Sequence, residues 1–213
     1  MQIAIALYER FTALDAIGPY QMLGGIPDAE VVFVAERAGT VRDDSGRLAL
    51  VADKTFAEAA HPDVLVVPGG PGQSDQMENG PLLDWLRTAD ATSTWTTSVC
   101  TGSLALAAAG LLDGRTATSH WLALGELEKL GVRPSEERVV FDGKYVTAAG
   151  VSSGIDMGLA LVGRIAGDER AQTVQLITEY DPQPPYDAGS PKKAPAHLVE
   201  MFREQTRFKD APA

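Results

Sequence analysis

Short, almost wholly apolar runs recur along this chain, separated by stretches long enough for a helix. The clearest are residues 3–7 (IAIAL), 31–35 (VVFVA) and 64–67 (VLVV). A strand that is apolar on both faces must be covered on both faces, as happens in a parallel sheet between helices. The pattern therefore predicts an α/β fold built on a mostly parallel sheet.

The remaining segments complete this alternation. Residues 48–52 should form an edge strand or a hairpin, residues 142–143 a tight hairpin turn, and residues 181–195, which are rich in proline, a loop. Asp168 is the expected cap of one helix. We expect further strands at residues 95–99, 116–119, 139–141 and 144–148, and helices at 12–23, 81–89, 101–109, 121–130, 154–166, 168–180 and 196–208. No linker or repeat divides the sequence, so we expect one domain over residues 1–213.

Charge and composition narrow the partners available to this chain. The formal net charge is −11, and no cluster of Lys or Arg could bind a polyphosphate backbone, so we expect no nucleic-acid partner. The longest apolar stretches fall well short of the roughly twenty residues that span a bilayer, so no membrane partner is expected. A single cysteine cannot form an internal disulfide. No signal peptide precedes the first apolar run, which together with the lone cysteine predicts a cytoplasmic protein.

The one cysteine, Cys100, lies where a strand passes directly into a helix, within residues 98–102 (SVCTG). A buried cysteine is most often an inert, small apolar side chain. This position, however, is that of a nucleophile elbow, where a sharp turn presents a side chain at the carboxyl edge of the sheet. A helix N-terminus also favours thiolate over thiol. Cys100 is therefore the candidate nucleophile.

Two further segments could act beside this thiol, and each also has a structural interpretation. Residues 68–72 (PGGPG) follow another buried strand. They could be a connecting turn, or their Gly69 and Gly70 amides could stabilise developing negative charge. Asp15 could pair with Thr12 as a helix cap, or it could be an acid/base group.

The histidines, His61, His120 and His197, are scattered along the chain. His120 ends an expected strand and could approach Cys100, or it could be a structural side chain. No spacing of Cys, His and Asp suggests a metal site, so none is expected.

Segments along nearly the whole chain resemble the ThiJ/PfpI superfamily, whose class I glutamine amidotransferase-like fold is a flavodoxin-like, three-layer α/β sandwich. Within that superfamily the chain is most similar to the isocyanide hydratase subgroup. The resemblance is carried by residues 14–19 (LDAIGP), 67–70 (VPGG), 97–103 (TSVCTGS), 108–115 (AAGLLDGR), 117–121 (ATSHW), 150–156 (GVSSGID), 179–181 (EYD) and 188–191 (AGSP).

The resemblance implies a role for particular positions. Cys100 would be the nucleophile, Asp15 the acid that hydrogen-bonds to it, and Thr101 a hydroxyl beside the same pocket. Gly69, Gly70 and Val151 would line that pocket. Many superfamily members carry His directly after the cysteine and Glu at the acid position, so Thr101 and Asp15 fit the hydratase subgroup.

The same resemblance implies a reaction and an assembly. An isocyanide would be hydrated to an N-substituted formamide through a covalent thioimidate on Cys100, with Asp15 moving the protons. No metal or organic cofactor is required, the substrate is a small molecule, and the protein would be a homodimer.

Three other interpretations remain open. Similar domains form the ligand-sensing half of AraC-type regulators, although few residues follow Tyr180 here, which favours a stand-alone protein. A redox-responsive stress protein would use oxidation of Cys100 instead of turnover. A glyoxalase-like or other hydrolytic enzyme would use His120 as its base.

Overall fold

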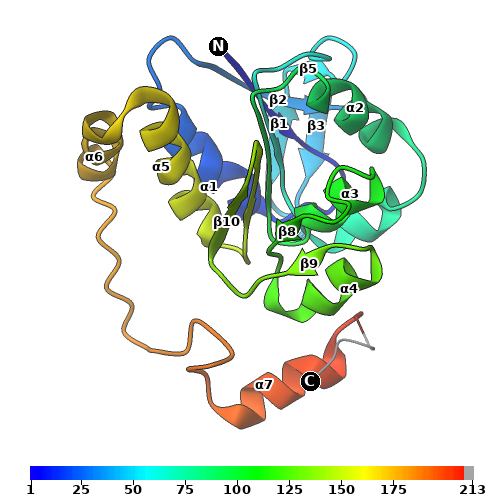
Figure 1. The fold of residues 1–213 in the computed structure, drawn as a ribbon, viewed down its shortest axis with the longest axis vertical. Helices are drawn as coiled ribbons and strands as arrows, with labels where there is room; N and C mark the ends of the chain where they lie inside the picture. Colours follow the sequence, from blue (N-terminus) through cyan, green and yellow to red (C-terminus); the bar gives the residue numbers. More distant parts are fainter. Residues whose placement is uncertain (209–213) are drawn as a thin grey trace.

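A seven-stranded sheet forms the centre of the computed structural model, which describes residues 1–208 (Figure 1). Across the sheet, the strands are β10 (Val139–Asp142), β11 (Tyr145–Ala148), β7 (Trp95–Val99), β6 (Val64–Val67), β1 (Gln2–Ala6), β2 (Glu30–Ala35) and β5 (Lys54–Thr55). Every neighbouring pair is parallel except β10 and β11. The predicted mostly parallel sheet is therefore confirmed.

The central strands are apolar because both of their faces are covered. All of β6 and residues 3–6 of β1 are completely buried. A polar side chain there would need a hydrogen-bond partner on a face packed by helices, and Val, Ile, Leu and Ala need none. These strands form the middle of the core, and their carboxyl ends lie side by side at one edge of the sheet.

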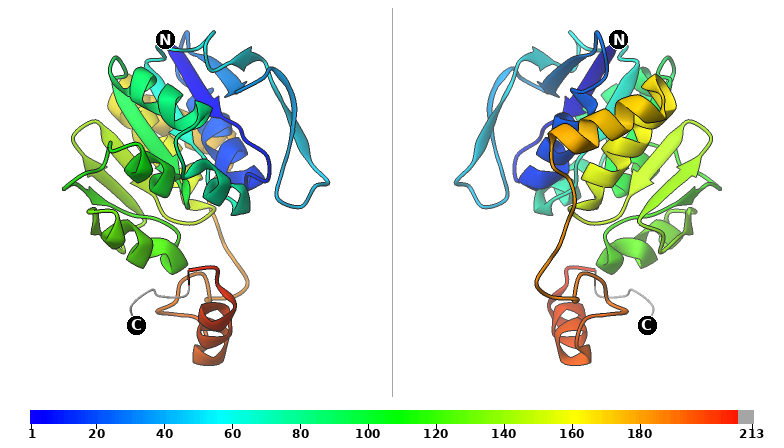
Figure 2. Two further views of the ribbon diagram at one scale, coloured as in Figure 1. Left: turned by 90° about the vertical axis from the view of Figure 1, so that its right-hand side faces the viewer. Right: turned by 90° about the vertical axis from the view of Figure 1, so that its left-hand side faces the viewer.

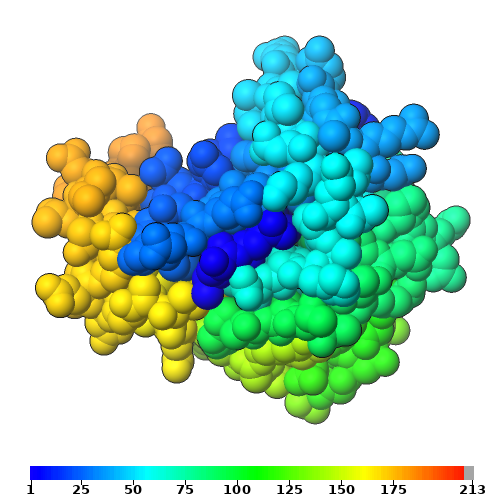
Figure 3. All heavy atoms as spheres, turned by 90° about the horizontal axis from the view of Figure 1, so that it is seen from above, coloured from blue at the N-terminus to red at the C-terminus, as the bar shows by residue number. Residues whose placement is uncertain are grey.

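Helices form a layer on each face of the sheet. One layer holds α1 (Ala13–Leu23), α5 (Ser153–Ala166) and α6 (Asp168–Ile177), and the other holds α2 (Pro81–Asp90), α3 (Gly102–Ala108) and α4 (Leu124–Lys129). Seen from above, the dark blue N-terminal strand lies between the yellow α5–α6 layer and the green layer (Figure 3). The three-layer sandwich is the expected architecture.

The two segments predicted as hairpins are confirmed, whereas one predicted strand is shorter than expected. β10 and β11 pair across Gly143 and Lys144, with Gly143 at φ 65°. Residues 48–52 form β4 (Ala49–Ala52), which pairs antiparallel with β3 (Gly39–Arg42) outside the main sheet. Figure 2 shows this hairpin projecting from the body. The strand expected at 116–119 is only β8 (Thr116–Ala117), which pairs with β9 (Arg133–Pro134).

Two helix starts differ from their predictions. Helix α6 begins at Asp168 and its N-cap is Gly167, so the prediction of Asp168 as the cap is wrong. Asp168 and Glu169 instead lie in the first turn, where negative charge interacts favourably with the helix dipole. The helix expected at 121–130 begins as the 3₁₀ turn η2 (Trp121–Ala123) before α4.

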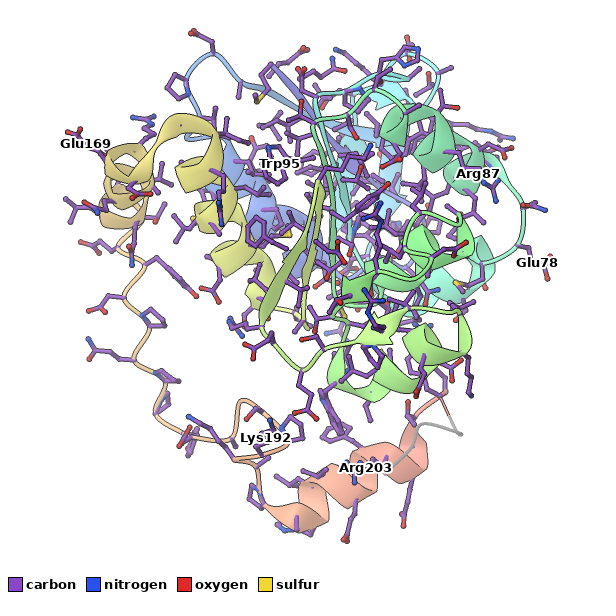
Figure 4. All side chains as sticks on the ribbon, viewed as in Figure 1. Glu78, Arg87, Trp95, Glu169, Lys192 and Arg203 are labelled. Atoms are coloured by element: carbon purple, nitrogen blue, oxygen red, sulfur yellow. The ribbon has the colours of Figure 1, made fainter. Side chains whose placement is uncertain are left out.

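The chain leaves the body after α6. Residues 181–195 are irregular and mostly exposed, with a turn at 190–194, and they lead to α7 (Ala196–Gln205). Trp95 lies at the start of β7, whereas Lys192 and Arg203 lie at the opposite end of the molecule, toward the carboxyl ends of the strands (Figure 4). Within residues 1–208 no helix has both the length and the apolar character needed to span a bilayer.

Candidate active site

Cys100 lies at the turn between β7 and α3 in a conformation that side chains other than glycine rarely adopt. Its φ is 58°, in the left-handed region, and its side chain is buried. The amide of Cys100 donates to the Ala148 and Ala149 carbonyls, and its carbonyl accepts from the Ser103 and Ser119 hydroxyls at 3.2 and 3.0 Å. Strained backbone persists only where its surroundings hold it, as these bonds do here. This is the geometry expected of a nucleophile elbow.

The elbow packs closely against the end of the neighbouring strand β6. A Cβ added at Gly102 would lie 2.1 Å from the Val67 carbonyl oxygen, so no larger residue fits there without moving backbone. Gly69 faces the elbow from the other side, where an added Cβ would lie 2.5 Å from the Thr101 nitrogen. These two glycines therefore allow the turn after β6 to lie against the nucleophile.

Asp15, on α1, reaches the same place and does not cap its helix. The carboxyl has no exposed surface, and its Oδ2 accepts a hydrogen bond of 2.9 Å from the Gly69 amide. The Thr12 side chain makes no capping bond and donates instead to Asp44. The interpretation of Thr12 and Asp15 as a capping pair is therefore wrong. Asp15 Oδ1 is buried without a partner of standard geometry among the described residues.

The charges of Asp15 and Cys100 are coupled. Burial raises the pKa of Asp15 to about 7, against hydrogen bonds from the Gly69 amide and the Cys100 thiol that lower it. Burial, and then the negative charge of Asp15, raise the pKa of the Cys100 thiol. Both groups cannot be ionised together in so dry a site. Above about pH 7, where Asp15 loses its proton first, the pair therefore holds one negative charge and one proton, and that proton can move between sulfur and the carboxyl.

The direction in which the pKa of the Cys100 thiol is shifted corrects one expectation from the sequence. The start of a helix was expected to lower the pKa of Cys100, and the Thr101 amide does act in that direction. Helix α3 has only seven residues, however, and burial beside a carboxyl outweighs its N-terminus. The proton on Asp15, more than the helix, decides whether the thiolate forms.

Thr101, Gly69 and Gly70 are brought together around this pair. The Gly70 amide donates to Thr101 Oγ1 at 3.1 Å, and the Gly69 amide donates to Asp15. Both amides are therefore already engaged in this structure. Their observed contacts fix the Asp15 and Thr101 side chains and leave no free donor pair for a substrate oxyanion.

His120 and Val151 lie on segments that border the elbow. His120 Nδ1 accepts from the Leu122 amide at 3.3 Å, and its ring packs on Gly150, where an added Cβ would lie 2.4 Å from Cδ2. Burial, followed by the positive charge of Arg207, lowers the pKa of His120. The imidazole is therefore neutral at pH 7 and holds the η2 turn. Val151 is half-buried in the turn between β11 and α5.

Two side chains near the thiol were not anticipated. Tyr8 follows β1, is buried, and donates its hydroxyl to the Pro68 carbonyl at 2.7 Å. Its place after a central parallel strand is a signal that could have identified it, because such strand ends meet at one edge of the sheet. Arg207 comes from beyond α7, and its positive charge lowers the pKa of Cys100. Nothing in the local sequence indicated it.

The site offers acid/base and nucleophilic groups but no cluster of metal ligands. Within residues 1–208 no group of three or more His, Cys, Asp or Glu side chains is arranged to hold a metal ion. What the arrangement can do chemically is attack an electrophilic carbon with sulfur while an adjacent carboxyl delivers or removes a proton.

Comparisons with known proteins point to one family. Residues 1–164 match the sequence model of the DJ-1/PfpI family. The chain is 42% identical to an isonitrile hydratase from Pseudomonas putida over 205 residues, which are 96% of this chain and 90% of that protein. The crystal structure of a ThiJ/PfpI family protein from Pseudomonas syringae superimposes with a TM-score of 0.93 at 40% identity, covering 99% and 89% of the two chains. An HTH-type transcriptional regulator from Rhizobium meliloti is 30% identical over 79% of this chain but only 52% of its own length.

Proposed function

The chain belongs to the DJ-1/PfpI family, and we propose that it is a cysteine-dependent hydratase that converts isocyanides to N-substituted formamides. The observation that carries the proposal is the buried pair of Asp15 and Cys100, which holds one proton and one negative charge between two side chains. Hydration of an isocyanide needs both a nucleophile and a proton for the same carbon atom. The hydratase from Pseudomonas putida supports this choice of substrate.

In the first half of the reaction the Cys100 thiolate attacks the terminal carbon of R–N≡C. The thiolate forms when the Cys100 thiol passes its proton to the ionised Asp15 carboxyl, whose raised pKa makes it a base for the thiol, and Asp15 then gives that proton to the carbon. The product is a thioimidate, R–N=CH–S–Cys100, beside an ionised Asp15. The Thr101 amide, which lowers the pKa of Cys100, stabilises the thiolate before attack. Thr101 and Gly69 hold the two reacting side chains in place.

In the second half water adds to the thioimidate carbon. The Asp15 carboxylate takes a proton from the water as the C–O bond forms, and it passes that proton to nitrogen. The tetrahedral adduct is R–NH–CH(OH)–S–Cys100. Asp15 then takes the hydroxyl proton, the C–S bond breaks, and R–NH–CHO leaves. Thiolate and protonated Asp15 are regenerated, so no cofactor is consumed.

The proposal includes a setting for this chemistry. A thiol nucleophile must stay reduced, which is the condition in the cytoplasm. We also propose that the protein works as a homodimer on a free small molecule. His120, whose lowered pKa keeps it neutral, has no proton-transfer step in this mechanism.

The test is formation of formamide from one aryl and one alkyl isocyanide, followed by mass spectrometry. The wild type should convert at least one of them, and Cys100→Ala should convert neither. Asp15→Asn keeps an acceptor for the Gly69 amide but cannot move protons, so we expect a loss of at least about 10²-fold in rate. Asp113→Asn, an exposed carboxyl in a turn, is the matched control and should keep the wild-type rate.

Each other outcome has a definite meaning. Equal rates for the wild type and Asp15→Asn would remove Asp15 from the mechanism. Failure of folded wild type to form any formamide would contradict the hydratase, and the similarity to a transcriptional regulator would then favour a ligand sensor. If His120→Gln lost activity while Asp15→Asn kept it, the result would favour a hydrolytic enzyme with His120 as its base.

A further inference from the structure

Arg207 lies more than a hundred residues after Cys100 in the chain, yet its side chain lies against the turn that borders the thiol. Residues 181–195 carry the chain away from α6, and α7 then lies beyond the carboxyl ends of the strands (Figure 1 and Figure 2). Residues 206–208 follow α7 and return to the body. The C-terminal segment thereby delivers a guanidinium to the site.

The guanidinium contacts one turn through three hydrogen bonds. It donates to the carbonyls of Pro71 and Gly70 at 2.5 and 3.1 Å and to Gln73 Oε1 at 3.2 Å. These acceptors lie at the start of η1 (Pro71–Gln76). The amide of Gly70 in turn donates to the Thr101 hydroxyl, next to Cys100. Gly70 therefore connects the guanidinium to the elbow, because its carbonyl accepts from Arg207 and its amide donates to Thr101.

Among residues 1–208, no acidic side chain pairs with Arg207. All three of its acceptors are uncharged. The nearby Asp75 is paired with Arg10 at 2.6 Å. Arg207 is exposed as a residue, but the hydrogen bonds from its Nη2 to Gly70 and Gln73 are partly buried, so the contact with this turn holds the charge near the site. Burial raises the pKa values of Cys100 and Tyr8, and the charge of Arg207 acts against that rise. For His120, the charge of Arg207 adds to burial in lowering the pKa.

We propose that Arg207 is a positioning residue of the Cys100 site, holding the turn at residues 70–73 against the nucleophile and placing a positive charge beside it. The inference rests on the proposed nucleophilic role of Cys100 but not on an isocyanide being the substrate. The charged side chains that act on the thiol are Asp15 on α1 and Arg207. Asp44 acts on Asp15, and Arg10, Asp75 and Tyr8 act on Arg207. Tyr8 after β1 and His120 are themselves shifted by the charge of Arg207. Among the groups of residues 1–208 that act directly on the thiol, Arg207 is the one cation.

The experiment measures alkylation of Cys100 by iodoacetamide between pH 6 and 11, by intact mass, because the raised pKa of the thiol moves the midpoint to alkaline pH. Because the chain has one cysteine, the added mass reports one site. The midpoint of the rate-against-pH curve reports ionisation, and its plateau reports access to the thiol. Removing the charge in Arg207→Gln should raise the midpoint by about half a pH unit or more. Below the midpoint, this corresponds to alkylation about three-fold slower.

Two further variants separate a local charge from a general one. Arg203→Gln removes the same charge from an exposed position on α7 (Figure 4) and should leave the midpoint unchanged. Arg207→Lys keeps the charge but loses the planar fork that reaches three acceptors. The midpoint of Arg207→Lys should therefore lie closer to that of the wild type than to that of Arg207→Gln. It also provides a folded variant should Arg207→Gln unfold, which circular dichroism would reveal.

A midpoint that stays at the wild-type pH in Arg207→Gln would overturn the proposal, and so would equal shifts in Arg203→Gln and Arg207→Gln. A midpoint in Arg207→Lys as high as that in Arg207→Gln would overturn the role of the charge. The measurement does not use an isocyanide. A midpoint shift specific to Arg207→Gln would therefore support the role of Arg207 even if the wild type formed no formamide. Formamide production by the wild type without such a shift would support the hydratase and contradict the role of Arg207.

Discussion

Asp15 is an acidic side chain with no exposed surface, one of whose oxygens lacks a standard partner among the described residues. Leaving such a group buried costs free energy, and a carboxyl in that position lowers the cost by keeping its proton. Cys100 beside it holds a strained backbone angle. Two adjacent residues that each work against stability indicate a site retained for chemistry.

The raised pKa of Asp15 predicts how stability depends on pH. Its value in the unfolded chain is 3.8, against about 7 when folded. Between these values the folded protein keeps a proton that the unfolded chain has lost, so stability falls as pH rises through this window. Asp15→Asn removes the effect. The free energy of unfolding of Asp15→Asn minus that of the wild type should therefore rise from pH 4 to pH 7.5 by an amount on the order of 3 kcal/mol.

Urea denaturation at several pH values measures this difference, because the other titrating groups are common to both proteins and cancel. Asp113→Asn, at an exposed position, should show a difference that stays flat with pH. A flat difference for Asp15→Asn as well would mean that the carboxyl is ionised in the folded protein at no cost. The proposed proton donor would then be absent at neutral pH.

The residues of the site differ in how much the sequence revealed about them. Cys100 was recognisable from its own surroundings, because an apolar strand and a helix of small residues meet at it. Asp15 was not, because Thr12 and Asp15 have the spacing of a cap, and only the resemblance favoured a catalytic role. Arg207 was not recognisable at all. Its position near the site depends on how the irregular segment at 181–195 and helix α7 return the chain to the body, which no local periodicity encodes.

At the scale of elements, the buried strands were the most predictable part. β1, β6 and β7 combine apolar or β-branched residues with burial, so composition alone located them. β3, β5 and β9 were not predicted, because residues such as Lys54, Arg133 and Pro134 carry no apolar signal. These strands exist through pairing with a partner, and that partner is not visible in the strand's own sequence.

The contact between α3 and β6 predicts an unusually sensitive glycine. In Gly102→Ala the new methyl would meet the Val67 carbonyl oxygen at 2.1 Å and that of Pro68 at 2.9 Å. Both are backbone atoms, so strand and helix must separate. We expect a loss of about 3 kcal/mol in the free energy of unfolding, measured by urea denaturation.

Gly189→Ala is the control for this change, because an added Cβ there meets no heavy atom within 4 Å. It should alter stability by less than about 0.5 kcal/mol. A Gly102→Ala protein as stable as Gly189→Ala would mean that the elbow can move away from β6 at little cost. The interpretation that rigid packing against β6 holds Cys100 in its strained conformation would then be wrong.

At the scale of the whole molecule, the surface combines a strong negative charge with exposed apolar side chains. The net charge of −11 favours separation of the chains in solution. Leu176 and Ile177, at the end of α6, are nevertheless 77% and 75% exposed. Ile177 borders a hollow of about 490 Å³ that is also lined by Tyr20 and Val31. Two large apolar side chains exposed side by side at a helix end are a candidate contact surface for a partner.

We therefore expect sedimentation equilibrium to give twice the 22.6 kDa mass of one chain, with the end of α6 in the interface. Leu176→Glu combined with Ile177→Glu would place two charges in that interface and should yield a monomer. Val51→Glu, at a 59% exposed position on the β3–β4 hairpin, should remain a dimer. A monomeric wild type would contradict the dimer itself. A dimer that survives the α6 changes but not Val51→Glu would move the interface to the hairpin.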